Sequence, residues 1–215
     1  MEHSQSNADI KCTVKVLLKS ALILIFLSAA IPINSYVVTY KEQFYRLFHV
    51  HYIQYPEDSI ENIYWLEKAV NAPFANPLHA LALIENEIQW EKYRYLFSMH
   101  LNIKLLEQHL FLGNKYNKRN AYFYNSPFKD SILESLDIAE TCYRAALYYW
   151  EEALKWAEKA NEKRFRWTDL PRVQFWQDEA FRIENGRLNY ARTIERELDN
   201  LQTVREKFQA MEKHY

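Results

Sequence analysis

The sequence predicts an all-α fold, with an N-terminal transmembrane or signal helix followed by antiparallel helical pairs. Only two of the 215 residues are glycine, Gly113 and Gly186. Sheets joined by tight turns need residues with positive φ, which glycine adopts at least cost, so this scarcity favours helices. Apolar residues also recur at three-, four- and seven-residue steps, as in amphipathic helices. Prolines punctuate these stretches where helices should begin or end, at positions 56, 73, 77, 127 and 171.

Composition excludes several classes of function. Loops that cradle nucleotide phosphates need several glycines within a few residues, and the sequence contains no such cluster. A formal net charge of −1 gives no overall attraction to nucleic acid, so no nucleic-acid partner is expected. Cys12 precedes the apolar N-terminal run and Cys142 follows it. The part of the chain after that run therefore cannot form an internal disulfide.

The N-terminal segment is typical of a membrane anchor or an export signal. Lys11, Lys15 and Lys19 precede the apolar run 20–38. As a helix this run would reach about 28 Å, close to the hydrocarbon thickness of a bilayer, about 30 Å. Its lysines should stay in the cytoplasm, which predicts a single-pass inner-membrane protein with its C-terminal domain in the periplasm. The alternative is a signal peptide cleaved near residues 28–30, which would leave a soluble periplasmic protein.

Three regions follow from this pattern. Residues 1–38 form a cytoplasmic stub and the transmembrane or signal segment, 39–56 a juxtamembrane helix, and 57–215 a helical domain. The juxtamembrane helix, 40–55, should place Phe44, Leu47 and Phe48 on one side. The next helix, capped by Asp58 or Ser59, should run to about Asn71 and group its apolar residues, which are Ile63, Leu66, Ala69 and Val70.

Three longer helical stretches follow in the domain. The first runs from Pro77 to Gly113, where the glycine is expected to end it. The second runs from about 128 to 163, and the third from 171 to 215 with an interruption near Gly186. The apolar stripe of the last helix consists of Ile194, Leu198, Leu201, Phe208 and Met211, and it is interrupted by Arg205.

A motif in the second stretch resembles the second helix of a tetratricopeptide repeat. Ala146, Trp150 and Ala153 have that repeat's spacing of a small residue, an aromatic and an alanine. Small residues let a neighbouring helix approach while the aromatic fills the gap beside them. The resemblance implies stacked helix pairs that bind proteins. The alternative is a long-helix bundle that shares this packing.

A second resemblance combines the basic N-terminal region, the single apolar segment and the tyrosine-rich string 112–125. Together these features resemble membrane-anchored periplasmic helical-repeat proteins of spirochaetes, some of which build the flagellar motor collar. This resemblance implies a scaffold within a large envelope assembly.

The sequence contains no pattern that supports catalysis, a cofactor or a metal site. His49 and His51 are two residues apart and do not share a helix face. Other histidines lack an acidic residue at metal-ligand spacing and are expected to be satisfied or exposed. Glu87 and Glu91, with Lys92 nearby, are expected to form a solvated face.

Two loops combine arginine with aromatic residues, the types that dominate protein interfaces. The candidate partner-binding residues are Arg119, Tyr122, Phe123, Tyr124, Arg164, Arg166 and Trp167. The alternative is that these aromatics pack beneath their own helices. We expect a non-catalytic, membrane-anchored periplasmic scaffold that binds protein partners and no small molecule. The alternative is a periplasmic small-ligand-binding protein or enzyme with a pocket between helices.

Overall fold

The computed structural model describes residues 37–121 and 127–212, and within them the protein is helical without strands, which confirms the all-α part of the predicted fold class. Val38–Tyr215 form one compact unit. The helices are α2 (Lys41–Gln54), α3 (Ser59–Asn71), α4 (Glu87–Tyr116), α5 (Lys129–Ala160), α6 (Gln174–Glu184) and α7 (Ala191–Ala210). Short 3₁₀ turns lie at η1 (Pro77–His79), η3 (Lys163–Phe165) and η4 (Pro171–Val173). None of the described helices is both long and apolar enough to cross a membrane. The apolar run 20–38, apart from its last two residues, lies outside the described part.

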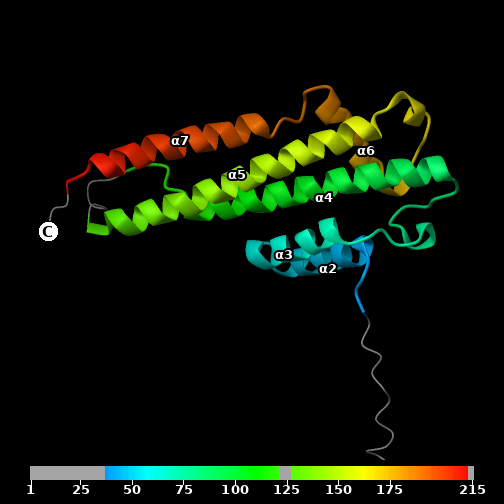
Figure 1. The fold of residues 1–215 in the computed structure, drawn as a ribbon, viewed down its shortest axis with the longest axis horizontal. Coiled ribbons are helices and arrows are strands. Elements are labelled where there is room, and N and C mark those ends of the chain that lie inside the picture. The colour runs from blue at the N-terminus through cyan, green and yellow to red at the C-terminus, as the bar shows by residue number, and fades with distance from the viewer. Residues whose placement is uncertain (1–36, 122–126, 213–215) are drawn as a thin grey trace, which may run out of the picture. The chain divides into compact units, whose positions relative to one another are not determined.

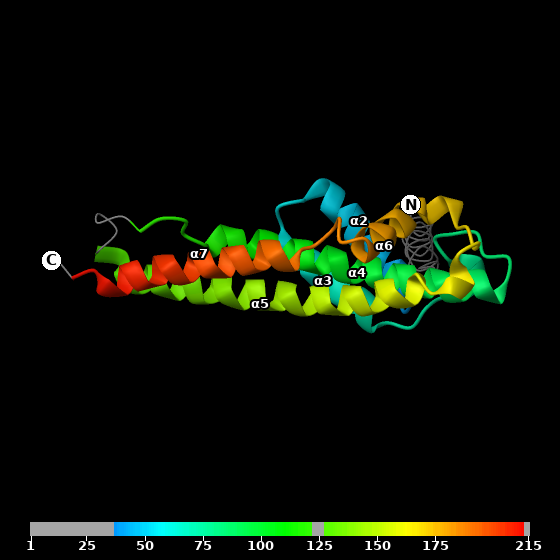
Figure 2. The same ribbon diagram turned by 90° about the horizontal axis from the view of Figure 1, so that it is seen from above.

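The two longest helices, α4 and α5, pack side by side in antiparallel directions (Figure 1). α7 lies along α5 in both views (Figure 2), and α6 packs against α4 and α5. The hairpin of α2 and α3 packs on α4 mainly through α3, and α2 contacts α4 through Tyr45. The helix expected at 39–56 therefore belongs to the same compact unit as the helices that follow it.

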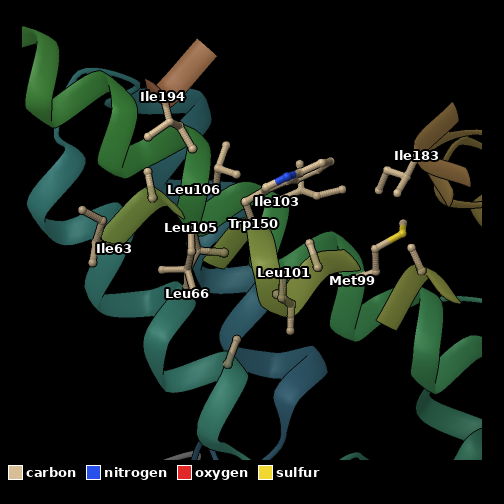
Figure 3. Close-up of a cluster of buried hydrophobic side chains, with 14 of the residues drawn as sticks. Ile63, Leu66, Met99, Leu101, Ile103, Leu105, Leu106, Trp150, Ile183 and Ile194 are labelled. Atoms are coloured by element: carbon tan, nitrogen blue, oxygen red, sulfur yellow. The ribbon is translucent and has the colours of Figure 1, made fainter. Parts of the chain in front are cut away.

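The core gathers side chains from all six described α-helices. In Figure 3, Leu66 of α3, Leu105 of α4 and Trp150 of α5 lie in one cluster, with contributions from α6 and α7. The expected apolar side of α3 is confirmed at Leu66 and Ala69, both 0% exposed. Burial of this kind is the main favourable term in folding.

The interface between α4 and α5 depends on small residues. α5 turns a row of fully buried alanines toward its neighbours, at positions 139, 146, 153, 157 and 160. On α4, Gly113 lies beneath the ring of Tyr143, and a Cβ on the glycine would be 2.6 Å from Tyr143 Cε1. The prediction that Gly113 ends the helix is wrong, because α4 continues to Tyr116. Gly113 instead permits the close approach of α5.

The first helical stretch also begins later than its periodicity predicted. Pro77 starts only a 3₁₀ turn, and α4 begins at Glu87 after Asn86, whose side chain caps it by accepting from Gln89 N. Leu81 and Ile84 have helical spacing, but they pack against the core from the preceding loop. That loop is held where Leu81 N donates to Tyr93 Oη at 3.1 Å.

The arginine within the apolar stripe of α7 has a structural explanation. Ile194, Leu201 and Phe208 are buried, as expected. Arg205 extends over α5, where its guanidinium lies 2.8 Å from Asp137 and 2.6 Å from Glu140. Its side chain is 15% exposed, so its aliphatic part covers the edge of the core while the charge is paired.

Candidate functional site

A cleft of about 660 Å³ lies where the loop 161–173 passes between the ends of α4, α5 and α6. The floor includes Leu96 of α4 and Ala160 of α5, while α6 forms one wall through Asp178 and Phe181. The loop forms the opposite wall and contributes Arg166 and Trp167. This volume falls within the range of ordinary ligand pockets, about 300–1,000 Å³.

The loop is fixed from below by a buried lysine. Lys92 is 9% exposed, and its ammonium group donates to Thr168 O at 2.6 Å, to Gln177 Oε1 at 2.7 Å and to Phe165 O at 3.3 Å. Burial lowers the pKa of Lys92, and the nearby carboxylate of Asp169 opposes that shift. The expectation that Lys92 belongs to a solvated face is therefore wrong. All three donor positions of its ammonium are used within the protein.

A second connection fixes the loop from its outer side. Arg164 forms a two-point ion pair with Glu91, with both distances 2.7 Å, and its Nε donates to Glu162 at 2.7 Å. Glu91 also accepts from Tyr95 Oη at 2.8 Å. Hydrogen bonds from Arg164 and Tyr95 lower the pKa of Glu91. The guanidinium of Arg164 is thus occupied within the protein, and it positions the loop.

Phe165 of the loop is buried in the core, and the two residues after it lie at the surface. Phe165 is 1% exposed and meets the ring of Tyr95 at 5.9 Å in an edge-on contact. Trp167, in contrast, is 88% exposed, and the guanidinium of Arg166 lies 5.3 Å from the centre of its ring. A buried anchor therefore holds a surface pair that consists of an arginine and a tryptophan.

The structure places Arg119 apart from this pair. Arg119 lines a different hollow, together with residues of α7 that include Arg196 and Glu197. Tyr122, Phe123 and Tyr124 lie outside the described residues. Only the second of the two predicted loops therefore contributes to the cleft within the part of the chain that the structure describes.

A family model described as a domain of unknown function, DUF8513, matches residues 88–211, which is more than half of the chain. The chain belongs to the DUF8513 family. No curated protein and no solved structure was found to match it. The DUF8513 match begins at the second residue of α4 and ends just after α7, so every residue that lines the cleft lies within it. The hairpin of α2 and α3 precedes the match.

A row of three hydrogen-bonded side chains connects that hairpin to the DUF8513 helices. His100 of α4 lies 2.8 Å through Nδ1 from Glu179 of α6, and 2.9 Å through Nε2 from Tyr45 Oη of α2. Burial lowers the pKa of His100, which favours the neutral ring. Since a carboxylate can only accept, Nδ1 donates to Glu179, and Nε2 accepts from Tyr45.

This arrangement resembles a proton relay, but its position favours a structural role. His100 is 2% exposed and lies 5.0 Å from the ring of Trp176, which is itself 1% exposed. A relay that acts on a substrate must reach the reacting atom, within about 3 Å. His100 is satisfied within the core, as expected. The same expectation is wrong for His109, whose two ring nitrogens are buried without a hydrogen-bond partner. Among the described residues, no group of three or more potential metal ligands comes together.

The residues of the loop itself are recognisable in the sequence, whereas the residues that fix the loop are not. Arg166 and Trp167 were identified because both are interface-type residues in a polar segment. The residues that fix the loop were not identified, because their hydrogen bonds join positions more than 70 residues apart in the sequence. These residues are Lys92, Gln177 and Glu91.

Proposed function

We propose that this DUF8513 protein is a non-catalytic scaffold that binds a protein partner at the 161–173 loop and the cleft beside it. The apolar run 20–38 tethers it to the inner membrane, and the helical domain lies in the periplasm as part of an envelope assembly. The two resemblances, to tetratricopeptide helices and to spirochaete collar proteins, support a scaffold of this kind.

The exposure of Trp167 carries this proposal. Tryptophan and arginine are enriched among residues that contribute most to protein interfaces. Here an 88% exposed tryptophan, with Arg166 beside it, projects from a loop that Lys92 holds from within the protein. Since the loop is already ordered by these bonds, little conformational entropy should be lost on binding.

Site-specific photo-crosslinking in cells tests this proposal. An aromatic photoreactive amino acid, which keeps a large ring at this position, replaces Trp167 in the full chain, and a matched variant carries it at Ile138, which is 40% exposed on α5. A discrete crosslinked protein should appear at 167 and be absent at 138. Equal crosslinking at both positions, or none at either, would contradict partner binding at the loop.

The volume of the cleft favours a second candidate, a small-ligand-binding protein. Its 660 Å³ would accommodate a small metabolite, with Phe181 as an apolar wall. A small molecule that co-purifies with the wild-type protein and is lost from F181A would support this candidate. In that case the crosslinks from position 167 should also be absent.

A further inference from the structure

The outer side of α2 is apolar and exposed. Leu47, Val50 and Ile53 follow one another at three-residue steps and are 36%, 57% and 67% exposed. The same helix buries Phe48 against the core. Three exposed aliphatic side chains on one short helix expose apolar area that water solvates poorly.

The polar residues around these three side chains are those of a helix at a membrane surface. The single acidic residue in α2, Glu42, is 1% exposed, so the outer side carries no carboxylate. Arg46 is exposed there, one turn before Val50. Exposed tyrosines lie at both ends of the helix, at positions 40, 52 and 55. Aliphatic, basic and tyrosine side chains together suit the boundary between lipid headgroups and acyl chains.

The start of α2 is fixed to the rest of the domain. Lys41 N donates to Pro73 O at 2.8 Å, and its ammonium group donates to the carbonyl oxygens of Ala69 and Val70 at 2.7 and 2.6 Å. Glu42 accepts from Ala75 N at 2.8 Å. α2 therefore cannot swing away from the domain without breaking several buried hydrogen bonds.

The chain leaves little distance between α2 and the proposed tether. The apolar run ends at Val38, and α2 begins at Lys41. Three residue steps span at most about 10 Å, even when fully extended. If the run spans the bilayer, α2 begins within that distance of its surface, and the fixed start of the helix limits how the domain can turn.

We infer that the outer side of α2, formed by Leu47, Val50 and Ile53, rests on the lipid bilayer at the level of the headgroups. This inference rests on the membrane tether in the proposed function. The contact orients the domain so that its binding loop has a defined height above the membrane.

Spin-label accessibility in nanodiscs of phosphatidylethanolamine and phosphatidylglycerol tests this inference. The full chain, with C12S and C142A, carries a single label at V50C, at I138C on α5 as a matched exposed control, or at L24C within the apolar run. Oxygen concentrates in lipid and a nickel chelate in water, so the ratio of their collision rates reports the surroundings. We expect a severalfold higher ratio at V50C than at I138C, and a still higher ratio at L24C.

The three labels separate the possible failures. A lipid-like L24C with equal ratios at V50C and I138C would overturn the bilayer contact and leave the tether intact. A water-like L24C would overturn the tether and the contact together. Dipolar broadening between V50C labels on two chains in one disc would show that a second copy covers this side, which also overturns the contact.

Discussion

The ammonium of Lys92 lies 2.6 Å from the carbonyl oxygen of Thr168, although 76 residues of chain separate them. This bond, with those to Phe165 and Gln177, fixes the 161–173 loop to α4.

Replacing Lys92 by methionine should loosen the loop. K92M keeps most of the side-chain volume but leaves the three acceptors without their donor, which should cost about 2 kcal/mol of unfolding free energy. Denaturant unfolding measures that cost, and hydrogen exchange should become faster across 161–173. K163M, at an exposed position of the same loop, is the matched control and should change neither. Unchanged exchange in K92M would show that the loop is held by other contacts.

A methyl group at Gly113 should destabilise the protein although alanine is the better helix former. The new Cβ would lie 2.6 Å from Tyr143 Cε1, and overpacking of this kind costs about 1–3 kcal/mol. The gain in helix propensity offsets about 1 kcal/mol. Chemical denaturation of G113A, Y143L and the double variant measures the coupling. The penalty of G113A should largely disappear in the Y143L background, and an equal penalty in both backgrounds would contradict the steric explanation.

Removal of the carboxylate of Glu179 should weaken the junction of α2, α4 and α6. E179A leaves the buried Nδ1 of His100 without its acceptor, at a cost of about 1–3 kcal/mol. Its neighbour Asp178 accepts only a long bond of 3.3 Å from Gln174 at the surface, so D178A should cost much less. Thermal unfolding of the two variants compares them directly. Equal losses of stability would contradict the role given to the His100 contact.

Stability should fall as pH decreases below about 6.5, partly because of His109. Burial lowers the pKa of His109 from 6.5 to about 4, and neither ring nitrogen has a hydrogen-bond partner. Between these pH values the unfolded chain takes up a proton that the folded histidine does not, so unfolding becomes easier by at most about 3 kcal/mol. His100, whose pKa is also lowered, adds to this slope.

The variant H109F isolates this contribution. Phenylalanine keeps the stacking on Tyr149, whose ring centre lies 5.4 Å from that of the histidine, and removes the titrating group. Unfolding free energies between pH 7 and about 4 should depend less on pH in H109F than in the wild type. A wild-type slope in H109F would show that His109 does not contribute to the pH dependence of stability.

Periodicity was sufficient to predict most helices, because their apolar residues repeat every three or four positions and bury one side. It failed at residues 77–86, where Leu81 and Ile84 keep that spacing but reach the core from a loop held by Tyr93. The sequence predicts a helix end at Gly113 because glycine is favoured there. In the structure the ring of Tyr143, 30 residues later, leaves no room for a side chain at this position.

The exposed residues of the site could be predicted from the sequence, but the buried residues that hold the loop could not. Arg166 and Trp167 stand out by residue type alone. The burial of Lys92 depends on a loop that folds back from the far end of α5, and no pattern near Lys92 signals it. Arg119 was predicted to bind a partner because its loop, 115–125, has a composition similar to that of the 161–173 loop. In the structure it lines a separate hollow beside α7.

We propose Trp167 as the main contact with a protein partner, and quantitative co-purification measures its contribution. W167A removes an 88% exposed ring and should leave the unfolding temperature nearly unchanged. Loss of an interface residue of this type costs about 2 kcal/mol or more, so partner recovery at limiting concentration should fall by a factor of about 10 or more. Undiminished recovery of the same partner by a folded W167A protein would show that Trp167 is not the main contact.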